Sequence, residues 1–266
     1  MSTSSLISHQ QNYLEFNGKK FGVTICEDIW NLGDNPLYRV CPMDELMKQK
    51  PDLMINVSAS PFDYDHDEDR KEVIRLNVKK YKLPMIYCNA VGAQTEIVFD
   101  GGSYAFDKDA NLCGALPMFT SDLSFYTCND DGTIQEPIIE PASRVPNKEL
   151  NPATLVADLN IDQIYKALVL GIKDYFTKMG FTKAILGSSG GIDSAVTLAI
   201  ATDALGAQNV IAVLMPSEFS TKHSVADAEL LSKNLDNPYH IVPIKSVYHS
   251  FLETLDPIFN GMPFSL

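Results

Sequence analysis

The stretch Leu186-Gly187-Ser188-Ser189-Gly190-Gly191-Ile192-Asp193-Ser194 joins an apolar run to a helix-forming segment through a turn of serine and glycine. Residues 183–186 predict a short buried strand, and the apolar spacing of residues 192–205 predicts a helix. The turn therefore lies at a helix N-terminus, where unpaired backbone N–H groups and the helix dipole favour an anion. Glycine lets the backbone approach that anion closely. The stretch thus predicts a phosphate cradle.

This cradle is not a Walker loop, because the spacing G-x-x-x-x-G-K-[ST] is absent and no lysine follows the glycines. The pattern S-G-G-x-D-S at residues 189–194 resembles the PP-loop of the ATP pyrophosphatases, which cleave ATP between its α- and β-phosphates to adenylate a substrate oxygen. The resemblance implies that the leaving pyrophosphate is held by the loop amides and two serine hydroxyls, and that an aspartate helps to bind Mg²⁺. The implied ATP-binding residues are Gly187, Ser188, Ser189, Gly190, Gly191, Ile192, Asp193 and Ser194, with Asp193 also at the metal. The alternative is a glycine-rich turn that only joins strand to helix, which requires neither paired serines nor this aspartate.

The segments after the loop continue the alternation of strand and helix. Residues 209–215 predict a second buried strand, residues 220–234 an amphipathic helix, and residues 239–244 a third strand with a helix after it. This order implies a doubly wound parallel sheet, whose ligands bind at the carboxyl ends of the strands. Met215-Pro216-Ser217 resembles a turn that lies near the adenine in NAD synthetases. An ordinary loop capped by Ser220 or Thr221 explains the same residues equally well.

A second candidate site lies near the start of the chain. Residues 21–30 (Phe-Gly-Val-Thr-Ile-Cys-Glu-Asp-Ile-Trp) predict a strand that ends at Cys26, followed by an acidic and aromatic turn. A thiol beside the backbone N–H of the next residue supplies a nucleophile and half an oxyanion hole. A lone cysteine, however, is more often a core residue than a catalyst.

The order of segments after Cys26 resembles the nitrilase superfamily, whose members hydrolyse amides and nitriles with a Glu-Lys-Cys triad. The matching segments are a strand and Ser-Pro turn, a helix, a buried strand and a Gly-Gly-Ser strand, over residues 52–61, 66–82, 83–90 and 99–107. The resemblance implies that Cys26 is the nucleophile, that the Glu27 amide is an oxyanion donor and that Ser60 lies near the glutamine. Ser60 also fits a plain turn position before Pro61. His66 stands where such glutaminase domains often carry a basic residue.

In this order the two halves resemble glutamine-dependent NAD synthetases over roughly residues 15–260. The implied α/β fold is the C-terminal part of a nitrilase-like αββα sandwich, followed by the N-terminal part of a doubly wound PP-loop domain. We expect the glutaminase domain at residues 1–128, a proline-containing linker at 129–149 and the synthetase domain at 150–266. The resemblance implies that the substrates are glutamine, ATP and deamido-NAD, that Mg²⁺ accompanies ATP, and that the enzyme is a homo-oligomer.

The chain also departs from these families. Only 25 residues precede Cys26, which leaves no room for the upstream Glu and Lys of the triad, and the chain stops at Leu266. We therefore expect an internal portion of a longer enzyme, inactive when tested alone. The rival interpretations are another PP-loop amidotransferase, a stand-alone nitrilase-type amidase and an inactive ATP-binding remnant.

Composition narrows the class of protein. The 266 residues are 45% hydrophobic, enough for two domains that each bury a core, and no apolar run reaches the length of a membrane span. We expect a cytoplasmic enzyme without a membrane partner. The net charge of −13 argues against nucleic acid, and five scattered cysteines without a C-x-x-C pair argue against a disulfide framework or zinc. The acidic residues at 63–69 predict a solvated loop and a helix N-terminus rather than a metal site.

Overall fold

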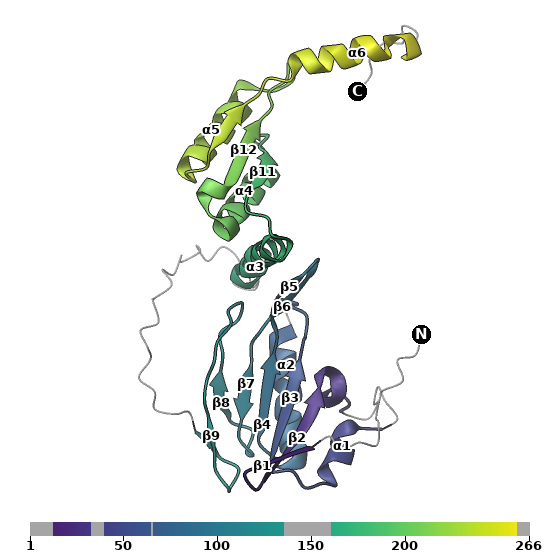
Figure 1. Ribbon diagram of the computed structural model, residues 1–266, viewed down its shortest axis with the longest axis vertical. Helices are drawn as coiled ribbons and strands as arrows, with labels where there is room; N and C mark the ends of the chain where they lie inside the picture. Colours follow the sequence, from purple (N-terminus) through teal and green to yellow (C-terminus); the bar gives the residue numbers. More distant parts are fainter. Residues whose placement is uncertain (1–12, 33–39, 65, 136–160, 260–266) are drawn as a thin grey trace. The chain divides into compact units, whose positions relative to one another are not determined.

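The computed structural model describes residues 13–32, 40–64, 66–135 and 161–259 (Figure 1). The chain divides into two compact units, Met1–Ala167 and Leu168–Leu266. The domain limits expected at residues 128 and 150 stay a prediction, since residues 136–160 are outside the described part of the chain.

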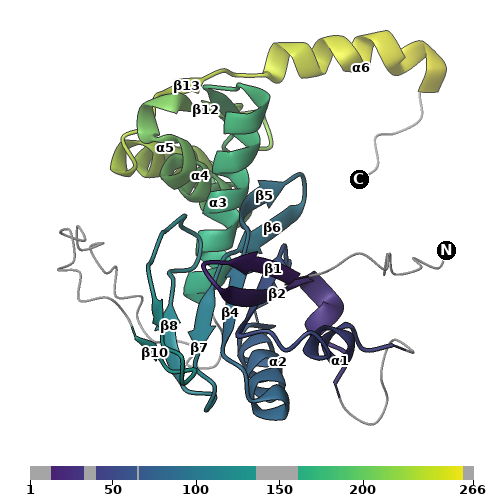
Figure 2. The same cartoon turned by 60° about the horizontal axis from the view of Figure 1, so that its bottom comes forward.

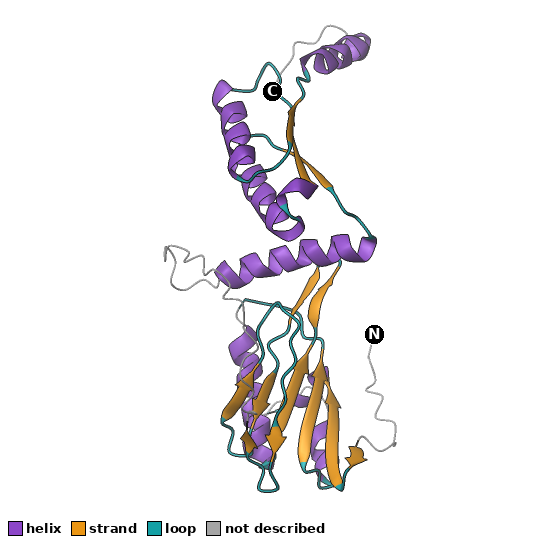
Figure 3. Cartoon of the chain, turned by 60° about the vertical axis from the view of Figure 1, so that its left-hand side comes forward, coloured by secondary structure: helices purple, strands orange, loops and turns teal. Residues whose placement is uncertain are grey.

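The first unit is built on a six-stranded sheet in the order β1-β2-β3-β4-β7-β8 (Figures 1 and 3). The pairs β2–β3 and β3–β4 are parallel, and the other pairs of this sheet are antiparallel. Two hairpins, β5–β6 and β9–β10, accompany the sheet. The strands are β1 (Tyr13–Phe16), β2 (Lys19–Ile25), β3 (Leu53–Ser58), β4 (Met85–Asn89), β5 (Val91–Gln94), β6 (Ile97–Asp100), β7 (Tyr104–Phe106), β8 (Leu112–Ala115), β9 (Thr127–Cys128) and β10 (Ile134–Gln135).

The β9–β10 hairpin overlaps the start of the expected linker. Residues 129–135 form its turn and second strand, and Ile134 is buried. These seven residues therefore have a regular structure, and the Asp131-Gly132 pair in the turn, with Gly132 at a φ of +80°, is typical of a β-hairpin. Residues 136–149 lie outside the described residues.

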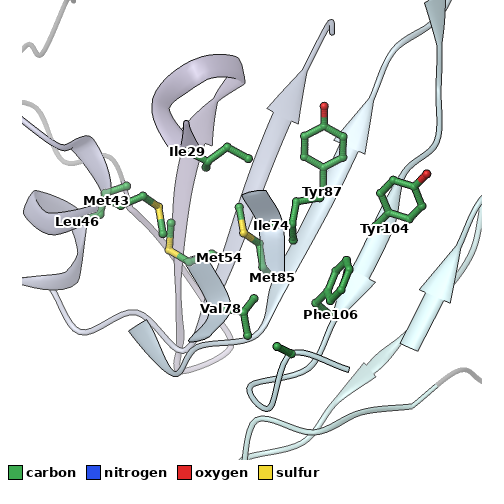
Figure 4. Packing of buried hydrophobic residues seen from close by; sticks show 11 residues of the cluster. Ile29, Met43, Leu46, Met54, Ile74, Val78, Met85, Tyr87, Tyr104 and Phe106 are labelled. Atoms are coloured by element: carbon green, nitrogen blue, oxygen red, sulfur yellow. The ribbon is translucent and has the colours of Figure 1, made fainter. Parts of the chain in front are cut away.

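Helices pack against one face of this sheet. They are the 3₁₀ helix η1 (Cys26–Ile29), α1 (Pro42–Met47) and α2 (His66–Tyr81). Their apolar side chains form a single cluster with alternate residues of β3, β4 and β7 (Figure 4), made of Ile29, Met43, Leu46, Met54, Ile74, Val78, Met85, Tyr87, Tyr104, Phe106 and Ala110. The described residues thus give one sheet with one helical layer, and the four-layered αββα sandwich expected from the sequence stays a prediction.

Helix α2 carries a buried ion pair on its core-facing side. Arg70 lies one turn before Ile74 on the stripe that continues to Val78, so its side chain enters the protein and is 1% exposed. There it meets the equally buried Asp100 carboxylate at 3.1 Å from Nη2 and 3.2 Å from Nη1. The pair is bidentate, the geometry in which an arginine and a carboxylate compensate each other best.

The second unit contains a three-stranded parallel sheet in the order β11-β12-β13. Figure 1 labels β11 and β12, and Figure 2 labels β12 and β13. Helix α3 (Ile161–Met179) runs across the division between the units. The elements after it are β11 (Ala184–Gly187), α4 (Ile192–Leu205), the 3₁₀ helix η2 (Ala207–Asn209), β12 (Val210–Leu214), α5 (Lys222–Asn234), β13 (Tyr239–Ile241) and α6 (Lys245–Phe259). Every strand and helix expected from residue 183 onward is present, although β13 ends three residues early and α5 starts two residues late.

Both crossover helices of this unit cover the same face of the sheet. Leu198 of α4 and Ala228 of α5 join one cluster with Val210, Ala212 and Leu214, which alternate along β12. Strands added in one direction by right-handed crossovers place their helices on one side, as here. A doubly wound arrangement needs helices on both faces, and it stays a prediction. In the described part of the chain, no helix combines the length and apolar character that crossing a membrane requires.

We predict that the Arg70→Met variant lowers the free energy of unfolding of the first unit by about 3–5 kcal/mol, because it leaves Asp100 buried without its partner. The fluorescence of Trp30, the one tryptophan of the sequence, during urea denaturation reports this unit. The matched control is Arg75→Met on the same helix. Arg75 pairs with Glu72 at the surface, where side-chain exposures of 34% and 48% limit the loss to about 1 kcal/mol. Equal losses of unfolding free energy in the two variants would show that the buried ion pair contributes no more to stability than the surface pair does.

Candidate functional site

The loop between β11 and α4 is anchored at both ends. The Ser188 N–H donates to the Val213 carbonyl at 3.0 Å, which extends the pairing of β11 and β12 by one residue and leaves Ser188 buried. Gly190 has a φ of +81°, and a Cβ added there would lie 2.1 Å from the Ser224 carbonyl oxygen of α5. Only glycine fits that position, since the neighbouring atom is backbone and the conformation is left-handed.

The two serines predicted to hold phosphate meet across this loop. Their hydroxyls are 3.1 Å apart, and the Ser194 hydroxyl accepts from the Ser189 N–H at 3.3 Å. The Ser189 hydroxyl in turn accepts from the Gly191 N–H at 3.2 Å. Helix α4 begins at Ile192, so the amides of its first turn have no intrahelical acceptor. Hydroxyls and first-turn amides therefore converge at one helix N-terminus, which is a suitable environment for an anion.

A pocket of about 200 Å³ opens beside this loop. The loop supplies one wall, and the other wall comes from the end of β12 and the segment leading into α5. The lining residues are Gly187, Ser188, Ser189, Leu214, Met215, Pro216, Ser220 and Val225. The Met215-Pro216 turn therefore shares a pocket with the loop. Thr221 is the N-cap of α5, accepting from the Ser224 N–H at 3.1 Å, so the expected helix cap is confirmed, while a place near the adenine stays a prediction.

Asp193 is the residue of the loop that could bind a cation. It lies exposed in the first turn of α4, and a carboxylate is a ligand type that Mg²⁺ prefers. Among the described residues no cluster of three or more His, Cys, Asp or Glu side chains is arranged to hold a metal. A single carboxylate suits Mg²⁺ that arrives with a nucleotide, because phosphate oxygens and water complete its shell.

Cys26 lies directly after β2, as the first residue of η1, and is partly exposed. Its φ is +48°, a left-handed value that is uncommon for a residue with a side chain. The carboxylate of Asp28 accepts from the Ile25 N–H at 2.8 Å, and Asn56 of β3 donates to the Cys26 carbonyl at 3.3 Å. The thiol therefore lies on a tight turn at the carboxyl end of a parallel strand.

Ser60 is held by the strand next to its own. Its backbone N–H donates to the Asn89 side-chain oxygen at 2.9 Å, and Ser60 is buried. The Asn89 amide in turn donates to the Gly101 carbonyl at 2.7 Å and to Asp100 at 3.2 Å. Because Asp100 is the partner of Arg70, the buried ion pair supports the Ser60 turn through a continuous set of hydrogen bonds.

Tyr87 is a further buried residue of the first unit, opposite Asn56 in the pairing of β3 and β4, and no motif of the sequence includes it. Burial raises the pKa of the Tyr87 phenol, while the nearby Arg70 charge opposes that shift and the Cys26 thiol adds to it. Its hydroxyl is buried and has no hydrogen-bond partner among the described residues. Tyr87 and Tyr104 stand side by side, with ring centroids 6.5 Å apart (Figure 4). The signal in the sequence is a tyrosine inside a strand that is otherwise apolar.

The remaining predicted residues have plain structural positions. Asp67 accepts from the Tyr104 hydroxyl and pairs with Lys71 at 2.8 Å, while Glu68 also pairs with Lys71 at the start of α2. This arrangement fits the expected helix N-terminus. All five cysteines are free. The His66 side chain lies outside what the structure describes.

The second unit is an α/β unit with a serine and glycine turn at the carboxyl end of a parallel strand. Residues 164–262, which cover most of this unit, match the NAD synthase family model.

The similarity to known proteins extends over almost the whole chain. The chain is 36% identical over 260 residues to the glutamine-dependent NAD(+) synthetase of Synechocystis sp., a match that covers 97% of this chain and 44% of the relative. The corresponding synthetase of Thermotoga maritima is 36% identical over 261 residues, covering 91% of this chain and 44% of the relative. The chain therefore resembles glutamine-dependent NAD(+) synthetases and spans less than half of their length.

Solved structures agree with the sequence matches. The glutamine-dependent NAD+ synthetase of Acinetobacter baumannii, solved in complex with ADP, superposes with a TM-score of 0.80 at 32% identity, covering 97% of this chain and 45% of that one. The synthetase of Cytophaga hutchinsonii, at 14% identity, gives a TM-score of 0.68 over 93% of this chain and 42% of that one. The second match shows the likeness of fold alone.

We predict that Gly190→Ala destabilises the second unit by about 3 kcal/mol or more, the sum of left-handed strain and the clash with Ser224. Gly180→Ala is the control, since Gly180 has a φ of +73° and no atom within 4 Å of the added Cβ. That control isolates the strain, about 1 kcal/mol. Urea denaturation, monitored by circular dichroism, measures the stability of both variants. A Gly190→Ala variant no less stable than the control would contradict the packing of the loop against α5.

Proposed function

We propose that this chain carries the thiol site and the ATP cradle of a glutamine-hydrolysing NAD(+) synthetase. The observation that carries the proposal is the pairing of two sites on one chain: a cysteine at a left-handed turn after β2, and a serine and glycine loop with a pocket after β11. The similarity to glutamine-dependent NAD(+) synthetases along 97% of the chain supports it. The finer fold assignment, a nitrilase-like first unit and a PP-loop second unit, is part of the same proposal.

In the first unit, we assign amide hydrolysis to Cys26. The sulfur attacks the side-chain amide carbon of glutamine, a C–S bond forms, and the carbonyl oxygen takes the negative charge. The Glu27 backbone N–H is the proposed donor to that oxygen, and Ser60 the proposed contact for the substrate. The C–N bond then breaks, and ammonia leaves with the proton of the thiol. Water hydrolyses the γ-glutamyl thioester to glutamate and restores the thiol.

In the second unit, we assign nucleotide binding to Gly187–Ser194. A carboxylate is a poor acyl donor, so the nicotinate carboxylate of deamido-NAD first attacks the α-phosphorus of ATP. The bond between the α-phosphorus and the bridging oxygen breaks, and pyrophosphate leaves. The Ser189 and Ser194 hydroxyls and the first-turn amides of α4 would bind this pyrophosphate. Ammonia then displaces AMP to give the amide.

Two observations support the nucleotide assignment. The relative from Acinetobacter baumannii was solved with ADP, a nucleotide of the same class. The pocket beside the loop also combines polar atoms of Ser188 and Ser189 with apolar atoms of Leu214, Met215 and Val225. Hydroxyls suit phosphates and apolar side chains suit a purine ring. Asp193 would hold Mg²⁺ together with the phosphate oxygens, and the ion would neutralise part of the phosphate charge.

Two of the rival interpretations account for less of the chain, and the third, an inactive ATP-binding remnant, is separated from the proposal by the activity test below. A stand-alone amidase has no use for the pocket at Gly187–Ser189 and Met215. A synthetase that pairs a PP-loop with an unrelated glutaminase does not match the similarity of the first unit to the relatives. We therefore retain one candidate function.

The Cys26→Ala variant tests the proposal directly. In the gene product that contains this chain, we expect it to lose glutamine-driven NAD synthesis by several orders of magnitude, because the nucleophile is gone. Synthesis driven by added ammonia should stay within about twofold of wild type, because it bypasses the thiol. The control is Cys88→Ala, which removes an exposed cysteine of β4 and should change neither rate. Glutamine use retained by the Cys26→Ala variant would place the nucleophile elsewhere.

A further inference from the structure

We infer that Asn56 is a positioning residue for the nucleophile: its buried side-chain amide holds the backbone of Cys26 in the conformation that aims the thiol. This inference rests on the proposed role of Cys26 in glutamine hydrolysis. Asn56 lies in the middle of β3, on the strand next to the one that ends at Cys26, and neither the sequence pattern nor the proposed chemistry assigns it a role.

The conformation of Cys26 needs support from its surroundings. A φ of +48° places Cβ close to the backbone carbonyl oxygen, which costs about 1–2 kcal/mol for a residue with a side chain. Such strain persists only where neighbouring groups determine the backbone. In a short peptide without these neighbouring groups, Cys26 would therefore adopt a negative φ, and its thiol would point in another direction.

Two hydrogen bonds supply this support, one on each side of the Cys26 Cα. Before it, the Ile25 N–H donates to the Asp28 carboxylate at 2.8 Å, a contact inside the turn itself. After it, the Cys26 carbonyl accepts from Asn56 Nδ2 at 3.3 Å, a contact from the neighbouring strand. Asp28 therefore shapes the turn, whereas Asn56 ties the turn to the sheet.

The orientation of the Asn56 amide follows from its partners. Nδ2 donates to the Thr24 hydroxyl at 3.0 Å as well as to the Cys26 carbonyl, so both of its hydrogens are used. The Thr24 hydroxyl gives its own hydrogen to the Ile55 carbonyl at 3.4 Å and is left as an acceptor. A flipped amide would set its oxygen against the Cys26 carbonyl oxygen, two acceptors facing each other.

This amide is costly for the fold. Asn56 is 0% exposed and Thr24 is 1% exposed, and Asn56 Oδ1 has no hydrogen-bond partner among the described residues. A buried acceptor without a donor destabilises a protein by about 1–3 kcal/mol. A leucine of similar volume would avoid that cost, so stability alone does not account for an asparagine at this position.

The hydrogen bond to the Cys26 carbonyl acts on the thiol through planar geometry. The peptide unit between Cys26 and Glu27 is rigid, so holding its carbonyl fixes the direction of the Glu27 N–H and the ψ of Cys26 together. With φ held by the Asp28 contact, the Cα–Cβ bond has one direction. A shift of the thiol by about 1 Å is enough to lower a reaction rate by about a hundredfold.

Labelling of the gene product that contains this chain tests the inference. A chloroketone analogue of glutamine reacts by attack of the Cys26 sulfur on the carbon that bears chlorine. The C–S bond forms, chloride leaves and the thiol proton goes to solvent. Because this probe must lie in the substrate position, its rate depends on where the thiol points. Iodoacetamide is the small probe that needs no such fit. Peptide mapping by mass spectrometry gives the rate at Cys26, with the other four cysteines as internal references.

For Asn56→Leu we expect chloroketone labelling of Cys26 to slow by about tenfold or more, while iodoacetamide labelling stays within about threefold of wild type. The matched control is Thr24→Val, which removes the other partner of the amide and leaves the contact to Cys26. We expect Thr24→Val to have a lower melting temperature than wild type. Its Cys26 should be labelled by both probes at the wild-type rate. Equal slowing of both probes in Asn56→Leu would instead show a change in access to the thiol rather than in its direction, and would overturn the inference.

The outcomes separate the inference from the proposed function. Asn56→Leu labelled by the chloroketone at the wild-type rate would overturn the inference and leave the role of Cys26 intact. Equal slowing in Thr24→Val and Asn56→Leu would also overturn it, since it would point to general destabilisation. Wild-type Cys26 labelled no faster than the other cysteines would overturn the proposed thiol site, and the inference with it.

Discussion

The parallel pairing of strands is the constraint on which both sites depend. Parallel strands bring their carboxyl ends to the same edge of a sheet, and the residues that follow them meet there. Cys26 follows β2 and the Ser60 turn follows β3, while Ser188 follows β11 and Met215 follows β12. Residues 27 to 34 positions apart in the sequence therefore become neighbours. In each unit, the residues proposed to act on a substrate are those that directly follow a strand.

The two units hold these turns by different physical means. In the first unit, a buried bidentate ion pair and the Asn89 amide fix the Ser60 turn, at the cost of removing two charges from water. In the second unit, the loop is fixed by the absence of a side chain, since Gly190 packs against the backbone of α5. A thiol site needs one exact side-chain direction, whereas a phosphate site needs open backbone amides. Hydrogen bonds therefore suit the turn that carries the thiol, and a glycine suits the loop proposed to bind phosphate.

Much of this arrangement could be predicted from the sequence, and the reason is local. Apolar periodicity and glycines predict the strand, the turn at residues 187–194 and the helix that follows. Helix α4 begins and ends at the predicted residues. The strand that leads to Cys26 was equally clear. Neither signal depends on distant residues, so a single sequence carries them.

The features that escaped prediction all depend on tertiary contacts. Arg70 looks like a surface residue in a charged helix, and only its spacing from Ile74 and Val78 places it on the buried stripe. Asn56 and Tyr87 gain their importance from neighbours on other strands. The left-handed conformation of Cys26 is imposed by Asn56 and Asp28, not by its own residue type. The turn and second strand of the β9–β10 hairpin lie within the expected linker, because strands of two residues are too short to show alternation.

Hydrogen exchange of the chain with and without Mg-ATP tests the central claim, that one chain holds two sites with separate ligands. The account predicts slower exchange in peptides covering residues 187–194 and 214–220 when Mg-ATP is present, with no change at residues 22–30 or 56–61. Unchanged exchange at the loop and the Met215 turn, or equal protection around Cys26, would contradict it.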